Sequence, residues 1–134
     1  MYSIIENLDE KHIEQLINLY QQCWWAKDRN VEDVEVMLSN SLIIGILSSS
    51  NSLIGFARIL TDGVFKALIF DVIVDEKYRG NGIGEMLINA IVSHPKIMKV
   101  KHFELYCKDE MIPFYQKWGF TTKLSNLNFM RKGI

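Results

Sequence analysis

The chain has 134 residues, of which 49% are hydrophobic and 23% are charged, and its formal net charge at pH 7 is −1. This length and composition are typical of a soluble domain with its own hydrophobic core, so we predict one domain over residues 1–134. A net charge close to zero provides no general attraction to nucleic acid or to an anionic membrane, and we expect neither as a partner.

The two cysteines, Cys23 and Cys107, are too far apart in the sequence for a metal-binding motif or a disulfide framework. We therefore predict no bound metal and two free thiols, which suit a reducing compartment. The sequence contains no basic segment followed by an apolar signal and no apolar run of about 18 residues. These features predict a cytoplasmic protein.

The first third of the chain predicts one short strand and two helices. Residues 3–6 favour a strand, and Asp9 is a suitable N-cap for the helix that follows. The apolar side chains of this helix recur at helical spacing, at Ile13, Leu16, Ile17, Tyr20 and Trp24. Asn30 can cap a second helix, which has acidic residues in its first turn.

Trp24 and Trp25 lie between these two helices and allow two interpretations. Adjacent residues of a helix point about 100° apart, so the two tryptophans are not expected to face one core. In the first interpretation, one tryptophan lies in the core and the other is half buried at its rim. In the second, the pair forms an aromatic wall of a binding site.

The middle of the chain predicts three strands, over residues 42–47, 53–61 and 65–74. The polar run 48–52 and the Asp62-Gly63 pair are turn signals, so these strands are expected to form an antiparallel meander. The third strand leads into a glycine-rich loop and then into a helix that ends near Pro95.

The last third predicts a strand over residues 101–107, a short helix between Pro113 and Gly119, and a terminal hairpin. The hairpin strands are residues 120–123 and 127–131. A strand, a helix and a further strand imply a parallel, right-handed crossover. The predicted fold class is therefore α/β in the sense of mixed α+β, with a mixed, mostly antiparallel twisted sheet.

The glycine-rich loop Arg79-Gly80-Asn81-Gly82-Ile83-Gly84 connects a strand to a helix. Three glycines at alternate positions expose backbone N–H groups, and the helix N-terminus adds unpaired donors and the positive end of a dipole. Such a site binds phosphate or pyrophosphate, and Arg79 adds a fixed positive charge. Spacing alone leaves two interpretations open, a phosphate-binding loop and a tight turn that uses glycine for positive φ.

Two segments resemble motifs of the GNAT superfamily of N-acetyltransferases. Arg79-x-x-Gly82-x-Gly84 is similar to the loop with which that family binds the pyrophosphate of acetyl-CoA. Residues 113–120, which read Pro-Phe-Tyr-Gln-Lys-Trp-Gly-Phe, are similar to the family's Phe-Tyr-x-Lys-x-Gly-Phe segment. The resemblance implies one acetyl-CoA-dependent N-acetyltransferase domain, in which a sheet with helices on both faces opens between two central parallel strands.

The resemblance also implies how acetyl-CoA is bound. Its pantetheine arm would pair with the backbones of Phe70, Val72 and Val74, where the strands through Val72 and Tyr106 separate. A strand N–H near Phe70 or Val72 would polarise the acetyl carbonyl. The diphosphate would lie on the loop N–H groups of Arg79, Gly80, Asn81, Gly82, Ile83 and Gly84. One departure is that residues 107–110 read Cys-Lys-Asp-Glu, without the asparagine that many family members carry after the second central strand.

The reaction that the resemblance implies is the direct attack of an amine on a thioester. Only the neutral amine attacks, so a base or a water chain that leads to one is useful. Asp71, a carboxylate inside an apolar strand, is the first candidate base, and Asp109 is the second. The alternative for Asp71 is that it faces a polar rim or forms an ion pair with Arg58 or Lys66.

Tyr115 matches the family position that protonates the leaving thiolate, with simple packing of a helix tyrosine on the sheet as the alternative. Cys107 would allow an acyl-cysteine route, although a strand cysteine is more often a small buried apolar residue. We therefore expect Tyr115 and Asp71 to be the catalytic residues.

The expected acceptor is a small aryl or alkyl primary amine, whose apolar body would rest on Trp24 or Trp25. This expectation rests on the resemblance of residues 61–65 to the hairpin of arylalkylamine-type acetyltransferases. Two alternatives are a CoA-binding regulatory module without turnover and an enzyme that acetylates a protein N-terminus or lysine. The protein is expected to be a monomer or a homodimer.

Overall fold

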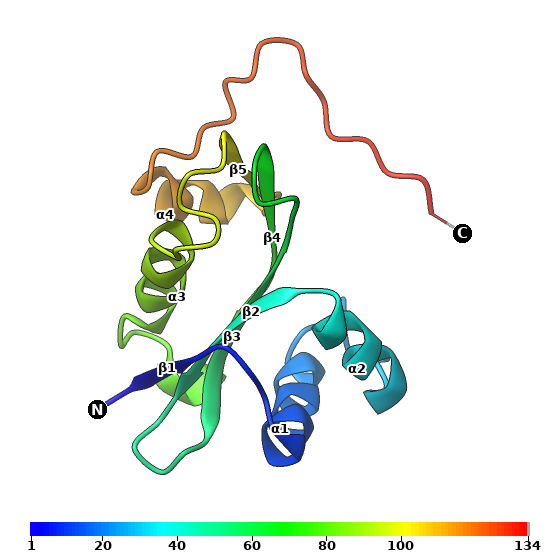
Figure 1. Cartoon of the computed structure of the whole chain (residues 1–134), viewed down its shortest axis with the longest axis vertical. Coiled ribbons are helices and arrows are strands. Elements are labelled where there is room, and N and C mark those ends of the chain that lie inside the picture. Colours follow the sequence, from blue (N-terminus) through cyan, green and yellow to red (C-terminus); the bar gives the residue numbers. More distant parts are fainter. Residues whose placement is uncertain (134) are drawn as a thin grey trace.

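The computed structural model describes residues 1–133 as one twisted sheet with helices on both of its faces (Figure 1). The strands are β1 (Ser3–Ile5), β2 (Leu42–Leu47), β3 (Leu53–Thr61), β4 (Lys66–Val74) and β5 (His102–Glu104). The helices are α1 (Glu10–Gln21), α2 (Val31–Ser39), α3 (Ile83–Val92) and α4 (Ile112–Gln116). Two short 3-10 helices are η1 (Glu76–Tyr78) and η2 (Asp109–Met111). None of the helices in these residues has both the length and the apolar character needed to cross a membrane.

The strand order in the sheet follows the chain, β1-β2-β3-β4-β5. The first four strands pair antiparallel, and β4 pairs parallel with β5. A parallel pair requires a crossover, which α3 supplies. Helices α1 and α2 lie on one side of the sheet, and α3 and α4 lie on the other (Figure 1). The predicted mixed, mostly antiparallel sheet is therefore confirmed.

Helices α1 and α2 begin at the predicted caps. Asp9 Oδ1 accepts a hydrogen bond from the His12 N–H at 2.8 Å, and Asn30 Oδ1 accepts one from the Asp33 N–H at 2.8 Å. Each cap satisfies a backbone donor that the helix itself leaves unpaired. Because these signals are local in sequence, both helix starts were predictable.

The sheet separates two hydrophobic cores, which hold the site in place from both sides. The core beneath α1 and α2 includes Leu16, Leu19, Tyr20, Phe56 and Ile73. The core beneath α3 and α4 includes Ile44, Ile69, Ile83, Leu87 and Tyr115. Each large apolar side chain buried in this way contributes ~1.5–3 kcal/mol. Strands β3 and β4 are thus packed on both faces.

A β-bulge interrupts the pairing of β3 with β4. Two residues of β4, Asp71 and Val72, oppose the single residue Ala57 of β3. Asp71 has φ +54°, in the left-handed region that Asp tolerates better than most residues with a side chain. The extra residue changes which face the following side chains of β4 occupy.

The C-terminal part of the chain differs from prediction in two places. The strand expected over residues 101–107 is present only as β5, and the terminal hairpin expected over residues 120–123 and 127–131 is wrong, because residues 117–133 contain no strand. An isolated hairpin is marginal unless one of its faces is buried. Here Leu127 and Met130 are 76% and 88% exposed, so no such burial supports one.

Candidate active site

Strands β4 and β5 separate at the centre of the candidate site. Their parallel pairing covers three residue pairs and ends at Leu68–Glu104. Beyond this point β4 continues, while β5 has ended. The predicted opening between these strands is therefore present, and within residues 1–133 β4 has no strand partner on that side beyond Leu68. Such an edge can pair with an extended ligand.

The glycine-rich loop follows β4 and η1 and begins α3. Gly80 and Gly82 have φ +83° and +78°, in a region that residues with a Cβ adopt at a cost. Gly82 is the N-cap of α3, and no side chain of residues 1–133 caps this helix. The first-turn N–H groups of α3 are therefore free to bind an anion. The loop combines the positive φ of a tight turn with the free donors of a phosphate site.

The space in front of the loop is open. Apart from its chain neighbours, a Cβ atom at Gly80 or at Gly82 would meet no atom of the described residues within 4 Å. A Cβ at Gly84 would lie 3.2 Å from the Phe114 ring, so this glycine lets α3 pack closely on α4. With two glycines on its open side and one on its packing side, the loop leaves room for the diphosphate of acetyl-CoA.

Tyr115 lies in α4 with 7% of its surface exposed, and its ring packs against those of Phe114 and Phe120. Burial, and then the nearby Cys107, raise the pKa of Tyr115 to about 12. Within residues 1–133 the Tyr115 hydroxyl forms no hydrogen bond. Its oxygen is not fully buried, so it is partly accessible. Buried tyrosine hydroxyls usually form a hydrogen bond. Because this one forms none within residues 1–133, it can donate to a ligand.

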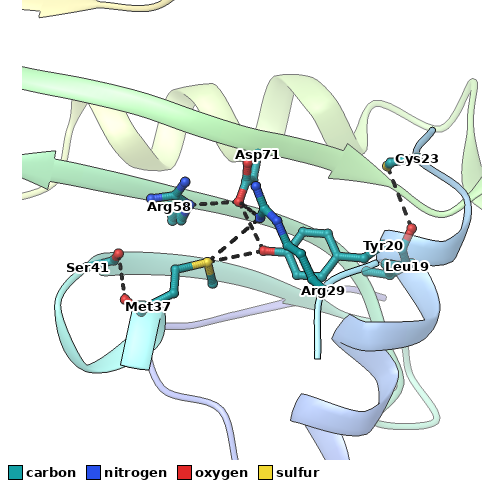
Figure 2. A network of polar contacts seen from close by, with 8 residues as sticks. All are labelled: Leu19, Tyr20, Cys23, Arg29, Met37, Ser41, Arg58 and Asp71. Carbon is teal, nitrogen blue, oxygen red and sulfur yellow. Dashed lines mark hydrogen bonds and ion pairs between the residues drawn. The ribbon is translucent and has the colours of Figure 1, made fainter. Parts of the chain in front are cut away.

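Four side chains meet at the bulge, on the side of the sheet that faces α1 and α2, and we name them the arginine–aspartate cluster: Tyr20, Arg29, Arg58 and Asp71 (Figure 2). Asp71 Oδ2 accepts hydrogen bonds from Arg29 Nη1 at 2.6 Å, from Arg58 Nε at 2.7 Å and from the Tyr20 hydroxyl at 3.0 Å. The cluster joins α1, the loop before α2, β3 and β4 at one point.

The cluster has one positive charge in excess, because two guanidinium groups surround one carboxylate. Burial lowers the pKa of Arg29, but the hydrogen bond and the charge of Asp71 outweigh it, so the pKa is raised overall. Burial, and then the charge of Asp71, raise the pKa of Tyr20 above its ordinary value. Tyr20 therefore stays a neutral donor, and Arg29 stays cationic.

The ion pairs of Asp71 bear on its predicted role as the base. The alternative pairing with Arg58 is present, whereas Lys66 pairs with Glu104 at 2.9 Å. All three hydrogen bonds of Asp71 are made by Oδ2, so within residues 1–133 its other carboxylate oxygen, Oδ1, forms none. The base role stays a prediction, and so does that of Asp109, which begins η2. The pKa of Cys107 is raised by burial and then by Asp109, which disfavours its reactive thiolate form.

Both tryptophans of the candidate acceptor wall lie in the loop after α1, since this helix ends at Gln21. Trp24 is 71% exposed and Trp25 is 43% exposed, so the interpretation that places one of them in the core is wrong. The Lys108 Nζ lies 5.6 Å from the Trp24 ring, which brings this loop beside the segment that follows β5. The Trp25 ring lies 5.4 Å from the Arg29 guanidinium. Their role toward a substrate stays a prediction.

Three aromatic rings extend from the cluster toward the C-terminal segment, and we name them the aromatic row: Phe70, Tyr106 and Phe129. The Arg58 guanidinium lies 4.8 Å from the Phe70 ring. Ring centroids are 6.1 Å apart for Phe70 and Tyr106 and 4.7 Å apart for Tyr106 and Phe129. The Arg131 guanidinium lies 5.2 Å from the Tyr106 ring. The C-terminal segment thus returns to the opening between the strands, on the side of α1 and α2 (Figure 1).

Sequence reasoning did not assign Tyr20 or Arg29 to the site. Tyr20 has the spacing of a core residue, and Arg29 lies in a loop without a motif. The only signal was Asp71 itself, because a carboxylate in an apolar strand requires cationic partners. Within residues 1–133, no group of three or more His, Cys, Asp or Glu side chains is arranged to hold a metal ion.

The sequence matches known acetyltransferases. A model of the acetyltransferase (GNAT) family matches residues 5–120. The chain is 32% identical to the uncharacterised N-acetyltransferase ycf52-like of Prochlorococcus marinus over 125 residues, which is 90% of this chain and 67% of that protein. It is 30% identical to the histone acetyltransferase TAP1 of Glycine max over 107 residues, which is 72% of this chain and 46% of that protein.

The fold matches as well. A crystal structure of a GNAT-family protein from Xanthomonas campestris superposes with a TM-score of 0.86 at 28% identity, covering 100% of this chain and 94% of that chain. The chain spans about two thirds of the length of the first curated relatives it matches, with 66% for the ycf52 protein of Pyropia yezoensis.

Proposed function

This chain belongs to the acetyltransferase (GNAT) family, and from that premise we propose that it is an acetyl-CoA-dependent N-acetyltransferase that acts on a small primary amine. The observation that supports this proposal most directly is the end of the β4–β5 pairing at Leu68–Glu104. The unpaired strand edge leads straight into the open glycine loop, so one extended ligand can occupy both.

We assign the binding of acetyl-CoA to two backbone surfaces. The edge of β4 at Phe70, Val72 and Val74 pairs with the pantetheine arm, and the loop from Arg79 to Gly84 binds the diphosphate. Acetyl-CoA supplies a thioester whose carbonyl carbon is open to attack. An N–H of β4 at Phe70 or Val72 donates to the carbonyl oxygen, which gains negative charge during the attack.

The proposed reaction is a direct transfer. The neutral amine nitrogen forms a bond to the acetyl carbon, the carbon–sulfur bond breaks, and the sulfur leaves as a thiolate. As the new bond forms, the nitrogen becomes acidic and releases a proton, so even a weak base is able to accept it. We propose that Asp71 accepts this proton, directly or through water, with Oδ1, because its Oδ2 is already hydrogen-bonded to Tyr20, Arg29 and Arg58.

Tyr115 is the proposed proton donor to the leaving thiolate. Its hydroxyl has no partner within residues 1–133 and stays protonated at neutral pH, because burial raises its pKa to about 12. A proton on this oxygen balances the charge that the departing sulfur carries. The same raised pKa makes Tyr115 a weaker acid than an ordinary tyrosine, so its contribution is smaller than that of a matched general acid.

The favoured acceptor is a small amine with an aryl or alkyl body. Trp25, beside the arginine–aspartate cluster, and the aromatic row provide apolar surface for that body. A second candidate is an amine of a protein, because one relative of this chain is named a histone acetyltransferase. The excess positive charge of the arginine–aspartate cluster favours the first candidate over a basic segment of a protein, because like charges repel.

A calorimetric titration with acetyl-CoA tests the proposal. We expect micromolar-range binding to the wild-type protein and a Kd about tenfold or more weaker for Gly82→Glu, which places a carboxylate against the diphosphate. The matched control is Gly63→Glu in the β3–β4 turn, because Gly63 has φ +77° and also no atom within 4 Å of its Cβ position. Equal affinity of wild type and Gly82→Glu would remove the loop from the site.

Turnover distinguishes an enzyme from a CoA-binding module. Release of free CoA thiol in the presence of a panel of primary amines measures the transfer directly. Tight binding of acetyl-CoA without amine-dependent thiol release, across the whole panel, would favour the regulatory module over the enzyme.

A further inference from the structure

We infer that the acceptor amine also carries an anionic group, a carboxylate or a phosphate, which binds to Arg29 and Arg58. This inference rests on the proposed function and names the class of acceptor for that same site. It adds a specificity-determining role for two residues whose contacts to Asp71 do not use all of their hydrogen-bonding capacity.

The charges of the arginine–aspartate cluster are incomplete by one anion. Asp71 neutralises one of the two guanidinium groups, and all three of its hydrogen bonds are made by Oδ2. Arg58 donates to it through Nε alone, at 2.7 Å. Within residues 1–133, the two terminal nitrogens of Arg58 therefore have no acceptor. A planar guanidinium with two free terminal nitrogens is suited to bidentate binding of a carboxylate or a phosphate.

Burial makes this excess charge a binding feature rather than a solvated surface. The side chains of Arg29, Arg58 and Asp71 are 29%, 16% and 5% exposed. Partly buried cations have lost most of their hydration, so an anionic ligand restores interactions that water no longer supplies. The rings of Tyr20 and Phe70 lie against Arg29 and Arg58, at 4.7 and 4.8 Å, and hold the guanidinium groups in place.

The position of the cluster matches the reaction. Phe70 connects the two features, because it lies in the part of β4 beyond the pairing with β5 and its ring lies beside Arg58. The bulge at Asp71 follows immediately, so the cationic side chains gather where the proposed acetyl group is held. If the anion of a small acceptor binds to Arg58, the amine nitrogen of the same acceptor therefore lies close to the acetyl group.

The same charges select against cationic acceptors. A basic peptide or a polyamine brings further positive charge to a site that already has one in excess, and the repulsion is poorly screened where water is excluded. The aromatic row and Trp25 accept an apolar body. The acceptor class is thus a small amine with one anionic group and room for an apolar side chain, such as an α-amino acid or a phosphorylated amine.

The test compares amines that differ only in the anion. Steady-state rates are measured with phenylalanine and phenethylamine, which differ by the carboxylate, with the other proteinogenic amino acids against their amides, and with O-phosphoethanolamine against ethanolamine. We expect kcat/KM to be about 10- to 100-fold higher for the anionic member of at least one kind of pair. A preference among the amino-acid pairs indicates a carboxylate, and a preference for O-phosphoethanolamine over ethanolamine indicates a phosphate.

Variants connect that preference to the two arginines. Arg58→Gln and Arg29→Gln are expected to reduce the anionic preference at least about tenfold, through KM more than through kcat. Arg58→Lys keeps the positive charge but lacks the planar guanidinium group, so this variant should retain part of the anionic preference. Lys99→Gln removes an exposed positive charge outside the cluster and is the control. Thermal melting verifies that each variant is folded.

The result that overturns the inference is equal kcat/KM for both members of every pair, which leaves the proposed transferase intact. A binding measurement tests the inference even if none of the amines in the panel is the true acceptor. Calorimetric titration with the N-acetyl derivatives of the same amines, in the presence of CoA, should show tighter binding of the anionic members, and Arg58→Gln should abolish the difference. Equal binding, or no binding of any derivative to wild type, also overturns it, whereas failure of acetyl-CoA to bind overturns the proposed function.

Discussion

Ile69 and Ile73 lie four residues apart on β4, yet their side chains belong to opposite hydrophobic cores. In a regular strand, residues separated by four point to the same face. The bulge at Asp71 adds one residue between them and reverses the alternation. This single extra residue allows Phe70 and Asp71 to face α1 and α2 together, and so it creates the arginine–aspartate cluster.

The first prediction concerns Asp71, which combines a positive φ with two ion pairs. Asp71→Asn should destabilise the fold less than Asp71→Ala, by about 1 kcal/mol, because Asn tolerates the left-handed region and Ala does not. Both variants leave two partly buried guanidinium groups without their anion, which costs ~3–5 kcal/mol. Urea unfolding of both variants and of the wild type measures the three free energies.

The same substitution tests the proposed base. Asp71→Asn should lower kcat about 10²-fold or more, because the amide accepts no proton. Activity of Asp71→Asn equal to that of the wild type would leave Asp71 with a structural role only. Equal stability of the Asn and Ala variants would contradict the argument from φ.

The second prediction concerns the hydroxyl of Tyr115. Tyr115→Phe keeps the ring in the core and should leave acetyl-CoA affinity almost unchanged, while kcat falls by up to about 10²-fold. The loss is expected near the lower end for a general acid, because the thiolate of CoA leaves readily and water can replace the hydroxyl. Steady-state rates between about pH 6 and about pH 9 measure the effect.

The control for this variant is Tyr2→Phe, which removes a hydroxyl next to β1, at the opposite edge of the sheet from β5. Turnover of Tyr115→Phe within about twofold of the wild type across that pH range would exclude the general-acid role.

The third prediction follows from the raised pKa of Tyr115, which burial shifts from 10.0 to about 12. Below about pH 10 the tyrosine is protonated in both the folded and the unfolded chain, so its contribution to stability is complete. Between about pH 10 and about pH 12 only the unfolded chain loses the proton, and the free energy of unfolding falls by ~1.4 kcal/mol per pH unit from this group. Chemical denaturation over this range should show a shallower decline for Tyr115→Phe. The same decline in both proteins would contradict the raised pKa of Tyr115.

The fourth prediction concerns Gly55 of β3, which lies under the first residue of α3. A Cβ atom at Gly55 would lie 2.7 Å from Cγ2 of Ile83, closer than two such atoms approach. Gly55→Ala should therefore destabilise the fold by ~1–3 kcal/mol and displace the start of α3. Because the N-terminus of α3 carries the proposed diphosphate site, acetyl-CoA should also bind more weakly.

Gly133→Ala is the control for Gly55→Ala, since a Cβ at Gly133 meets no atom within 4 Å. Urea unfolding and acetyl-CoA calorimetry on the two variants separate the loss of packing from the loss of binding. Unchanged stability of Gly55→Ala would show that α3 moves without cost.

The sequence by itself determined the features that depend on residues close together in the chain. Asp9 and Asn30 each cap a helix through a backbone N–H three residues away, and the glycines at 80 and 82 supply the positive φ that the loop before α3 requires. The antiparallel meander of β2, β3 and β4 follows from the turns between these strands, and the parallel crossover follows from the order strand, helix, strand. Local steric and hydrogen-bonding preferences decide such features, so they can be predicted from the sequence.

Only the tertiary structure decided the arginine–aspartate cluster and the course of the C-terminal segment. Arg29 and Tyr20 are 42 and 51 residues from Asp71 in the sequence, and their contacts exist because the core beneath α1 and α2 fixes α1 against β4. The bulge that directs Asp71 toward them depends on the register of β4 against β3. The terminal residues alternate like a hairpin but do not form one, because pairing is stable only where the fold provides a surface that buries one face. Pattern predicts which face a side chain prefers, whereas packing decides which partner it meets there.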